Sequence, residues 1–244
     1  MPIAAIFADT HAEPKPVYDW LQWLETVLPF PVIKASYGDL GEDSLRVRRS
    51  KKSGLLYSAN TVPVFALKPD GKKGMFQRRC TGDYKVNVVQ REIKKLLGLR
   101  RVKKSSGILC EQWIGISVDE AHRMKDPRVP WIRNRWPLVD LGMSRQDCLN
   151  WMKDRGYPQP PRSACVFCPY HSDSEWHRLK TQDPDGFQDA VKFEQSLQQS
   201  VGKTDIVDSV PYLHSSCIPL KDVTFDPDGV KDSFGNECEG MCGN

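Results

Sequence analysis

The first 36 residues alternate short apolar runs with one amphipathic segment. Residues 4–9, "AAIFAD", are almost continuously apolar and end in Asp-Thr, a pattern typical of a buried parallel strand. Residues 16–28 repeat apolar side chains at steps of three and four, which predicts an amphipathic helix that ends before Pro29. Residues 30–36, "FPVIKAS", predict a second strand. Strand, helix and strand in this order predict an α/β unit whose strands are parallel neighbours.

The middle of the chain has a weaker pattern. Residues 39–74 are rich in Gly, Ser, Lys and Arg, which predicts an irregular region. Residues 84–97, "YKVNVVQREIKKLL", predict a basic helix, and residues 110–117, "CEQWIGIS", predict a third buried strand.

Helical signals return in the last third of the chain. Ser144 and Asp147 have the spacing of a capping box, and Gly156 is a typical stop, so this segment predicts a helix. Residues 173–200 predict two further helices separated near Asp183 and Pro184, and the tail from Ser215 predicts mostly loop.

Length and composition indicate an ordinary globular protein. The chain has 244 residues, of which 39% are hydrophobic, and we expect it to form one large domain or two modest ones. It shows neither a membrane span nor a secretory signal, so a cytoplasmic location is the default expectation. In that setting the eight cysteines are expected to be thiols or metal ligands rather than disulfides.

The formal net charge of +4 conceals a strong asymmetry. Residues 46–104 contain 18 Lys and Arg against 3 Asp and Glu, so the remainder of the chain is acidic. Such a basic field attracts polyanions, and this favours DNA or RNA, or another phosphate-rich ligand, as a partner of residues 46–104. A solvated surface of basic helices and loops is the alternative interpretation.

The segment "SACVFCPYH" places Cys165 and Cys168 on one tight turn. Two thiolates at this spacing supply half of a tetrahedral metal site. Candidate partners are Cys80, the pair Cys238 and Cys242 in "CEGMC", and less plausibly His171. Four thiolates suit zinc or an iron–sulfur cluster equally well. A redox dithiol and a pair of inert buried cysteines are the competing interpretations.

Several further segments, taken in order, resemble a known family. The set consists of "FADT" (7–10), "RRCTGDYK" (78–85), "WIGISVDEAHR" (113–123), "WPLVDLGMSRQDC" (136–148), "PPRSACVFCP" (160–169) and "FGNECEGMCG" (234–243). Together these segments resemble the phosphoadenosine phosphosulfate reductase-like branch of the PP-loop, or adenine nucleotide α-hydrolase-like, superfamily. The likeness covers nearly the whole chain.

The resemblance implies a fold and a domain plan. The fold would be a Rossmann-like α/β parallel sheet flanked by helices, with an adenine nucleotide beyond the carboxyl ends of the strands. Residues 1–160 would form this domain, with a basic insertion at about residues 39–104. Residues 161–244 would form a Cys-rich helical and loop region packed on it. From the cysteines themselves we expect Cys80, Cys165 and Cys168 to belong to one site for a 4Fe-4S cluster or zinc, with Cys238 or Cys242 completing it.

The resemblance also implies roles for individual residues. Those expected to line the nucleotide site are Asp9, Thr10, Arg79, Thr81, Gly115 and Ser117. Those expected to take part in the chemistry are Cys80, Lys85, Glu120 and Arg123. Guanidinium and ammonium groups suit phosphate or sulfate oxygens, which agrees with these assignments. A surface salt bridge is the alternative for each charged residue taken singly.

One feature of the family is missing. Its members begin with a strand and a Ser-Gly-Gly-x-Asp-Ser loop that cradles pyrophosphate, whereas this sequence contains no Gly-Gly. We therefore expect an N-terminally truncated sheet. The loop would lie upstream, come from a partner chain or a second copy, or be lost together with the reaction.

Three functional hypotheses follow from the sequence. The first is a reductase or sulfur-transfer type PP-loop enzyme that acts on an adenine nucleotide or on a sulfur-bearing, even nucleic-acid, substrate. The second is a non-catalytic nucleic-acid-binding protein stabilised by zinc or an iron–sulfur site. The third is a thiol–disulfide oxidoreductase.

Overall fold

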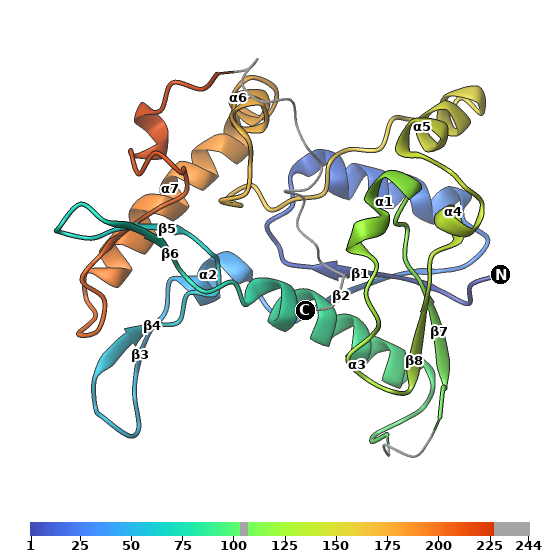
Figure 1. The fold of residues 1–244 in the computed structure, drawn as a ribbon, viewed down its shortest axis with the longest axis horizontal. Helices are drawn as coiled ribbons and strands as arrows, with labels where there is room; N and C mark the ends of the chain where they lie inside the picture. Colours follow the sequence, from blue (N-terminus) through green and yellow to red (C-terminus); the bar gives the residue numbers. More distant parts are fainter. Residues whose placement is uncertain (103–106, 227–244) are drawn as a thin grey trace.

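Strands β1 (Ala5–Asp9) and β2 (Val32–Ser36) pair in parallel, and helix α1 (Lys15–Val27) connects them. These elements confirm the predicted strand–helix–strand unit. Helix α1 covers one face of the pair, and helix α3 (Asn87–Leu96) covers the other (Figure 1). The result is a local three-layer α/β arrangement in the computed structural model, which describes residues 1–102 and 107–226.

A second parallel pair consists of β7 (Cys110–Trp113) and β8 (Ile132–Arg135). Within the described ranges, β1–β2 and β7–β8 are separate two-stranded sheets. The fold is therefore mixed α/β with small parallel and antiparallel sheets flanked by helices. The continuous Rossmann-like sheet is not confirmed, because no hydrogen-bonded ladder joins the two pairs in the described part of the chain.

Residues 39–74 are more ordered than the sequence predicted. They contain α2 (Leu40–Ser44), β3 (Val47–Arg49), β4 (Leu56–Ser58), β5 (Phe65–Leu67) and β6 (Lys73–Met75). Strand β9 (Val210–Tyr212) adds to β5, so the three-stranded sheet has the order β6-β5-β9. Strands of three residues are too short to show an alternating pattern, which explains why the prediction of an irregular region was wrong.

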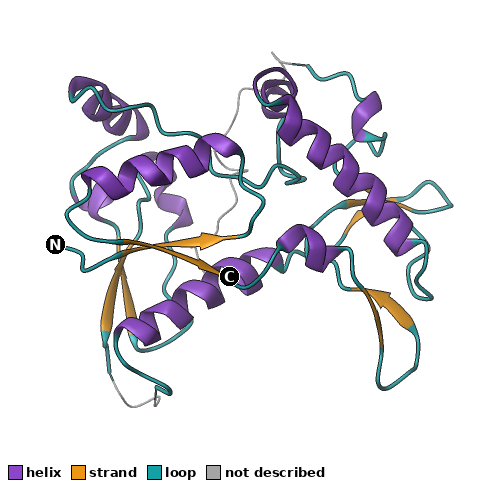
Figure 2. Cartoon of the chain, turned by 180° about the vertical axis from the view of Figure 1, so that it is seen from behind, coloured by secondary structure: helices purple, strands orange, loops and turns teal. Residues whose placement is uncertain are grey.

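The helices after residue 172 match their predictions. Helix α6 (Asp173–Gln182) and helix α7 (Pro184–Val201) meet at Asp183, whose side chain accepts a hydrogen bond from the Gly186 amide at 3.1 Å. Seen from behind, α7 crosses the half of the molecule that holds the short antiparallel strands (Figure 2). A single helical turn, η3 (Leu220–Asp222), follows β9.

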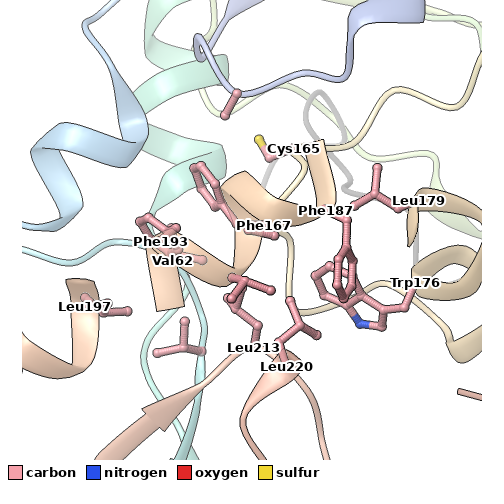
Figure 3. Packing of buried hydrophobic residues seen from close by; sticks show 14 of the residues in the cluster. Val62, Cys165, Phe167, Trp176, Leu179, Phe187, Phe193, Leu197, Leu213 and Leu220 are labelled. Carbon is pink, nitrogen blue, oxygen red and sulfur yellow. The ribbon is translucent and has the colours of Figure 1, made fainter. Parts of the chain in front are cut away.

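The largest apolar core lies in this half of the molecule. Trp176, Leu197 and Leu213 are at most 1% exposed, and Phe167 stacks on Phe193 with ring centroids 4.0 Å apart. Figure 3 shows this packing, with Cys165 at the edge of the cluster beside Phe167. The Cys-x-x-Cys turn is therefore fastened to the main core.

The remaining elements border the parallel strands. A π-helical turn, η1 (Thr81–Val86), leads into α3, and a 3-10 turn, η2 (Val118–Arg123), follows β7. Helix α4 (Pro137–Asp140) precedes α5 (Arg145–Asp154). The capping box predicted at Ser144 is confirmed, because Ser144 and Asp147 exchange side-chain to backbone hydrogen bonds. Within the described residues, no helix has the length and apolarity needed to cross a bilayer.

Candidate functional site

A cavity of about 500 Å³ opens beside the parallel strands. It is bordered by Ile6, Phe7 and Ala8 of β1, by residues 114–117 after β7, and by one side of α5. The volume falls in the range of ordinary small-molecule sites, roughly 300–1,000 Å³. Crevices of this kind, outside the strands of an α/β sheet, are common ligand sites.

Five residues that the sequence singled out line this cavity. They are Lys85, Gly115, Ser117, Glu120 and Arg123. Although 30 positions separate Lys85 from Gly115, η1 and η2 bring their segments to one wall. The motif resemblance therefore selected residues that do meet in space.

The cavity wall carries four cations and two carboxylates. The cations are Lys85, Arg123, Arg145 and Arg162, and the carboxylates are Glu13 and Glu120. Arg123 forms an ion pair with Glu120, and both side chains are only about a tenth exposed. The excess of cations in a partly buried site favours a ligand with negative charge.

Glu13, like Arg145 and Arg162, is a charged residue of this cavity that the sequence analysis did not single out. Its side chain is 1% exposed, lies 3.7 Å from the Lys85 ammonium and accepts a hydrogen bond of 3.0 Å from the Ser163 hydroxyl. A carboxylate buried this deeply needs such partners, because desolvation of a lone charge is costly. Glu13 therefore holds Lys85 at the cavity wall and joins the loop after β1 to the segment before the Cys-x-x-Cys turn.

The rest of the cavity lining is mainly apolar. It includes Val89 of α3, Leu138, and Leu149 and Met152 of α5, together with Ile114, Ile116, Pro160 and Pro161. Cys148 also lines the cavity, and burial raises the pKa of its thiol. A lining that has both cations and apolar side chains suits a ligand with an anionic end and a flat or apolar end.

Asp9, by contrast, is used in the local turn. Its carboxylate accepts hydrogen bonds from the Tyr18 hydroxyl at 2.9 Å and from the His11 amide at 2.8 Å. His11 adopts a left-handed backbone conformation with φ of 59°, so this turn redirects the chain from β1 into α1. Asp9 is not among the residues that line the 500 Å³ cavity.

Arg79 and Thr81 also lie outside this cavity. The Arg79 guanidinium donates to the Asn60 carbonyl at 3.3 Å, and Thr81, 7% exposed, accepts a hydrogen bond from Arg78 Nε at 3.0 Å. Both residues therefore connect the start of η1 to its neighbours, and their predicted role in nucleotide binding stays a prediction.

A second, much smaller cavity adjoins the cysteines. It is lined by Thr10, Cys80, Lys85, Cys165 and Cys168, among others. The Thr10 hydroxyl, fully buried, lies 3.3 Å from Cys165 Sγ. Lys85 lines both cavities, whereas Cys80 lines the smaller cavity and not the larger one.

The structure contradicts the predicted metal site. Across residues 1–102 and 107–226, no three or more His, Cys, Asp or Glu side chains are grouped so that they could hold a metal ion. The expectation that Cys80, Cys165 and Cys168 bind zinc or an iron–sulfur cluster is therefore wrong for this structure. The other two predicted ligands, Cys238 and Cys242, lie outside the described residues.

The neighbours of Cys165 give a physical reason. Its Sγ lies 3.3 Å from the buried Thr10 hydroxyl, and within the described residues no group of three potential ligands includes it. Burial, together with the negative charge of Glu13, raises the pKa of the Cys165 thiol well above its ordinary value. The alternative ligand His171 is turned away, because its Nε2 lies 3.0 Å from the Cys165 carbonyl and its ring packs edge-on against Trp176.

Comparisons with known proteins add no family. No protein-family model, no curated protein and no solved structure matches the chain. The resemblance to the phosphoadenosine phosphosulfate reductase-like branch therefore stays a prediction that depends on the quoted motifs.

Proposed function

We propose that the 500 Å³ cavity binds an adenine nucleotide, or an adenylated sulfur-bearing substrate of the kind that PP-loop proteins use. The observation that supports this proposal best is the gathering of Lys85, Glu120 and Arg123 around one cavity whose lining also has a large apolar part. In this arrangement the base occupies the apolar part and the phosphate or sulfate oxygens meet the cations.

The paired carboxylates have a positioning role in this proposal. Glu120 holds the Arg123 guanidinium, and Glu13 holds the Lys85 ammonium. A guanidinium fixed in this way can present two parallel N–H donors to an anion without first losing side-chain freedom. The pairs therefore preorganise the cationic wall.

The proposal extends to the class of reaction and to its setting. Cations that bind a phosphate or sulfate group also stabilise the charge that develops when the group is transferred. We propose a group-transfer enzyme in the cytoplasm, where cysteines remain thiols. The six cysteines of the described residues are free in this structure. The predicted nucleic-acid contact of residues 46–104 concerns a different surface and is taken up below.

Isothermal titration calorimetry with ATP and with adenosine phosphosulfate tests the proposal. We expect binding by the wild-type protein, much weaker binding of adenosine, and at least tenfold weaker nucleotide binding in Arg123→Ala and Lys85→Ala. Arg133→Ala is the matched control, because Arg133 is exposed on β8 and does not line the cavity.

Arg123→Ala and Lys85→Ala break buried ion pairs and can reduce folding, so a further variant, Arg145→Gln, is needed. Arg145 lines the cavity from the first turn of α5. This variant should keep the wild-type thermal unfolding midpoint and still lose nucleotide affinity. The proposal would be contradicted if the folded wild-type protein did not bind nucleotide. It would also be contradicted if Arg133→Ala lowered the nucleotide affinity as much as Arg145→Gln does.

A further inference from the structure

The hairpin formed by β3 and β4 projects from the body of the molecule (Figures 1 and 2). We call residues 46–58 the basic arm. Leu56 pairs with Arg49 at the loop end of the three-residue ladder, and it is held from outside: its amide donates to Asp205 Oδ2 at 2.7 Å, and the Asp205 amide donates to the Leu56 carbonyl at 3.0 Å. At the entry to the arm, the Ser200 hydroxyl donates to the Leu45 carbonyl at 2.6 Å. Helix α7 and the residues that follow it therefore hold the entry to the arm and the outer edge of β4, and residues 50–55 form the loop beyond the ladder.

The tip of the basic arm is also ordered. The Ser50 amide donates to the Leu55 carbonyl at 2.8 Å, and the Arg49 guanidinium donates to the Gly54 carbonyl at 2.7 Å. Gly54 has φ of 75°, a backbone conformation that glycine adopts without strain. The arm therefore has a defined shape up to its end.

Five cations and no acid lie on the basic arm. The exposed cations are Arg46, Arg48, Arg49, Lys51 and Lys52, and the sequence has no Asp or Glu between Asp43 and Asp70. Three of them, Arg48, Lys51 and Lys52, form no ion pair or hydrogen bond through their side chains within the described part of the chain. Their charges are therefore available to an external partner.

The cations of α3 differ in this respect. Lys95 pairs with Glu92 at 2.8 Å, and the Lys94 ammonium lies 5.6 Å from the centre of the Trp131 ring. Arg91 donates to the Ser36 carbonyl at 2.7 Å and also contacts Glu92. Within the basic field of the sequence, helix α3 is therefore internally paired, whereas the arm projects.

The strand register adds an aromatic ring to the same surface. Arg48 is directly opposite Tyr57 in the antiparallel pair, and opposite residues share one face of a ribbon. A cation beside a phenol ring on a projecting ribbon is a surface that suits the sugar–phosphate edge of a nucleic-acid groove.

We propose that the basic arm enters the major groove of double-stranded DNA, with Arg48, Lys51 and Lys52 on phosphate oxygens. A two-stranded ribbon fits the wide major groove of B-form DNA, whereas the major groove of A-form RNA is too deep and narrow for it. This inference does not depend on the ligand in the 500 Å³ cavity, so either proposal can fail without the other.

Fluorescence anisotropy with a labelled short DNA duplex, measured at a series of salt concentrations, tests the arm. With three phosphate contacts we expect the logarithm of the association constant to fall with the logarithm of salt concentration with a slope of about −3. The triple variant Arg48→Gln, Lys51→Gln, Lys52→Gln should bind at least tenfold more weakly at about 100 mM salt and should lose most of this slope.

The matched control removes the same number of charges elsewhere, through Lys153→Gln, Lys192→Gln, Lys221→Gln. These lysines are exposed on α5, α7 and η3. The control variant should keep at least half of the wild-type affinity, and both variants should keep the wild-type thermal unfolding midpoint. The proposal is overturned if the wild type does not bind the duplex, if the control loses as much affinity as the arm variant, or if an RNA duplex or a single strand binds as tightly as the DNA duplex.

Discussion

The two halves of the molecule use their buried side chains differently. Among the described residues, the half that contains α6, α7 and β9 has a core cluster of nineteen buried residues. The half with the parallel strands has clusters of four and of two buried residues in that part of the chain, with the 500 Å³ cavity beside them. Apolar burial is the main source of folding stability, so the first half stabilises the fold while the second retains an open, charged surface.

The same division separates the two groups of ionisable residues. Around the cavity, Glu13 and Glu120 are paired with cations that face the open space. In the main core, Glu194 accepts hydrogen bonds from the Leu213 and Leu220 amides, each at 2.7 Å, and so ties the chain after β9 to α7. Glu175 of α6, also buried, instead pairs with Arg178 and Arg162, so the core half uses buried carboxylates for both backbone and cationic partners.

Paired truncations of leucine in the two halves should give the largest difference. Leu197→Ala, in α7, removes a side chain that is 1% exposed and should lower the free energy of unfolding by about 2–5 kcal/mol. Leu149→Ala, in α5, removes a side chain that already faces a cavity and should cost about 1 kcal/mol or less. Urea denaturation of both variants measures this; equal losses would show that the cavity half is as tightly packed as the core.

The pH dependence of the free energy of unfolding tests a buried histidine of the core half. Burial lowers the pKa of His171 from its ordinary value of 6.5 to about 4, so the folded protein excludes a proton that the unfolded chain binds. Stability is fully present above about pH 6.5 and falls as the pH drops toward 4, by an amount on the order of 3 kcal/mol.

Substitution of His171 by leucine should remove this part of the pH dependence. The matched control is His177→Leu, which makes the same substitution at an exposed histidine of helix α6. Free energies of unfolding measured by urea denaturation at several pH values between 4 and 7.5 check both variants. An unaltered slope in His171→Leu would contradict the assignment of this effect to His171.

The smallest expected effect concerns the helix that borders the cavity. Helix α5 contains no fully buried residue, so its capping box contributes a larger share of its local stability. Ser144→Ala removes this cap and should cost about 1 kcal/mol, which hydrogen exchange of the α5 amides would detect as faster exchange confined to that helix. Ser144→Asp keeps a capping acceptor and should restore protection.

Long periodic segments were predictable, whereas short pairings were not. The apolar run of β1, the helical period of α1 and the capping signal of α5 each determine an element locally. Strand β9 is only three residues long, and its partner β5 lies more than 140 positions away, so nothing in the local sequence indicates the pairing. Pairings of this kind depend on tertiary packing.

The candidate site follows the same rule. Lys85, Glu120 and Arg123, which the quoted motifs singled out, line one cavity, but their roles there stay predictions. Glu13 was missed because its role depends on Ser163, 150 positions away, and on Lys85. The metal prediction failed for the complementary reason: the spacing of Cys165 and Cys168 shows that two thiols are close along the chain, but not whether further ligands lie beside them in the fold, and among the described residues none complete a group of three.

Protection of Cys148 from alkylation tests most directly the proposal that the 500 Å³ cavity binds a nucleotide. Cys148 lines the cavity, whereas Cys110 of β7 does not, and burial raises the pKa of both thiols, so Cys110 is an internal control. We predict that saturating ATP or adenosine phosphosulfate slows the reaction of N-ethylmaleimide with Cys148, followed by peptide mass spectrometry, and leaves the rate at Cys110 unchanged. An unchanged rate at Cys148, or an equal slowing at both cysteines, would contradict nucleotide binding in this cavity.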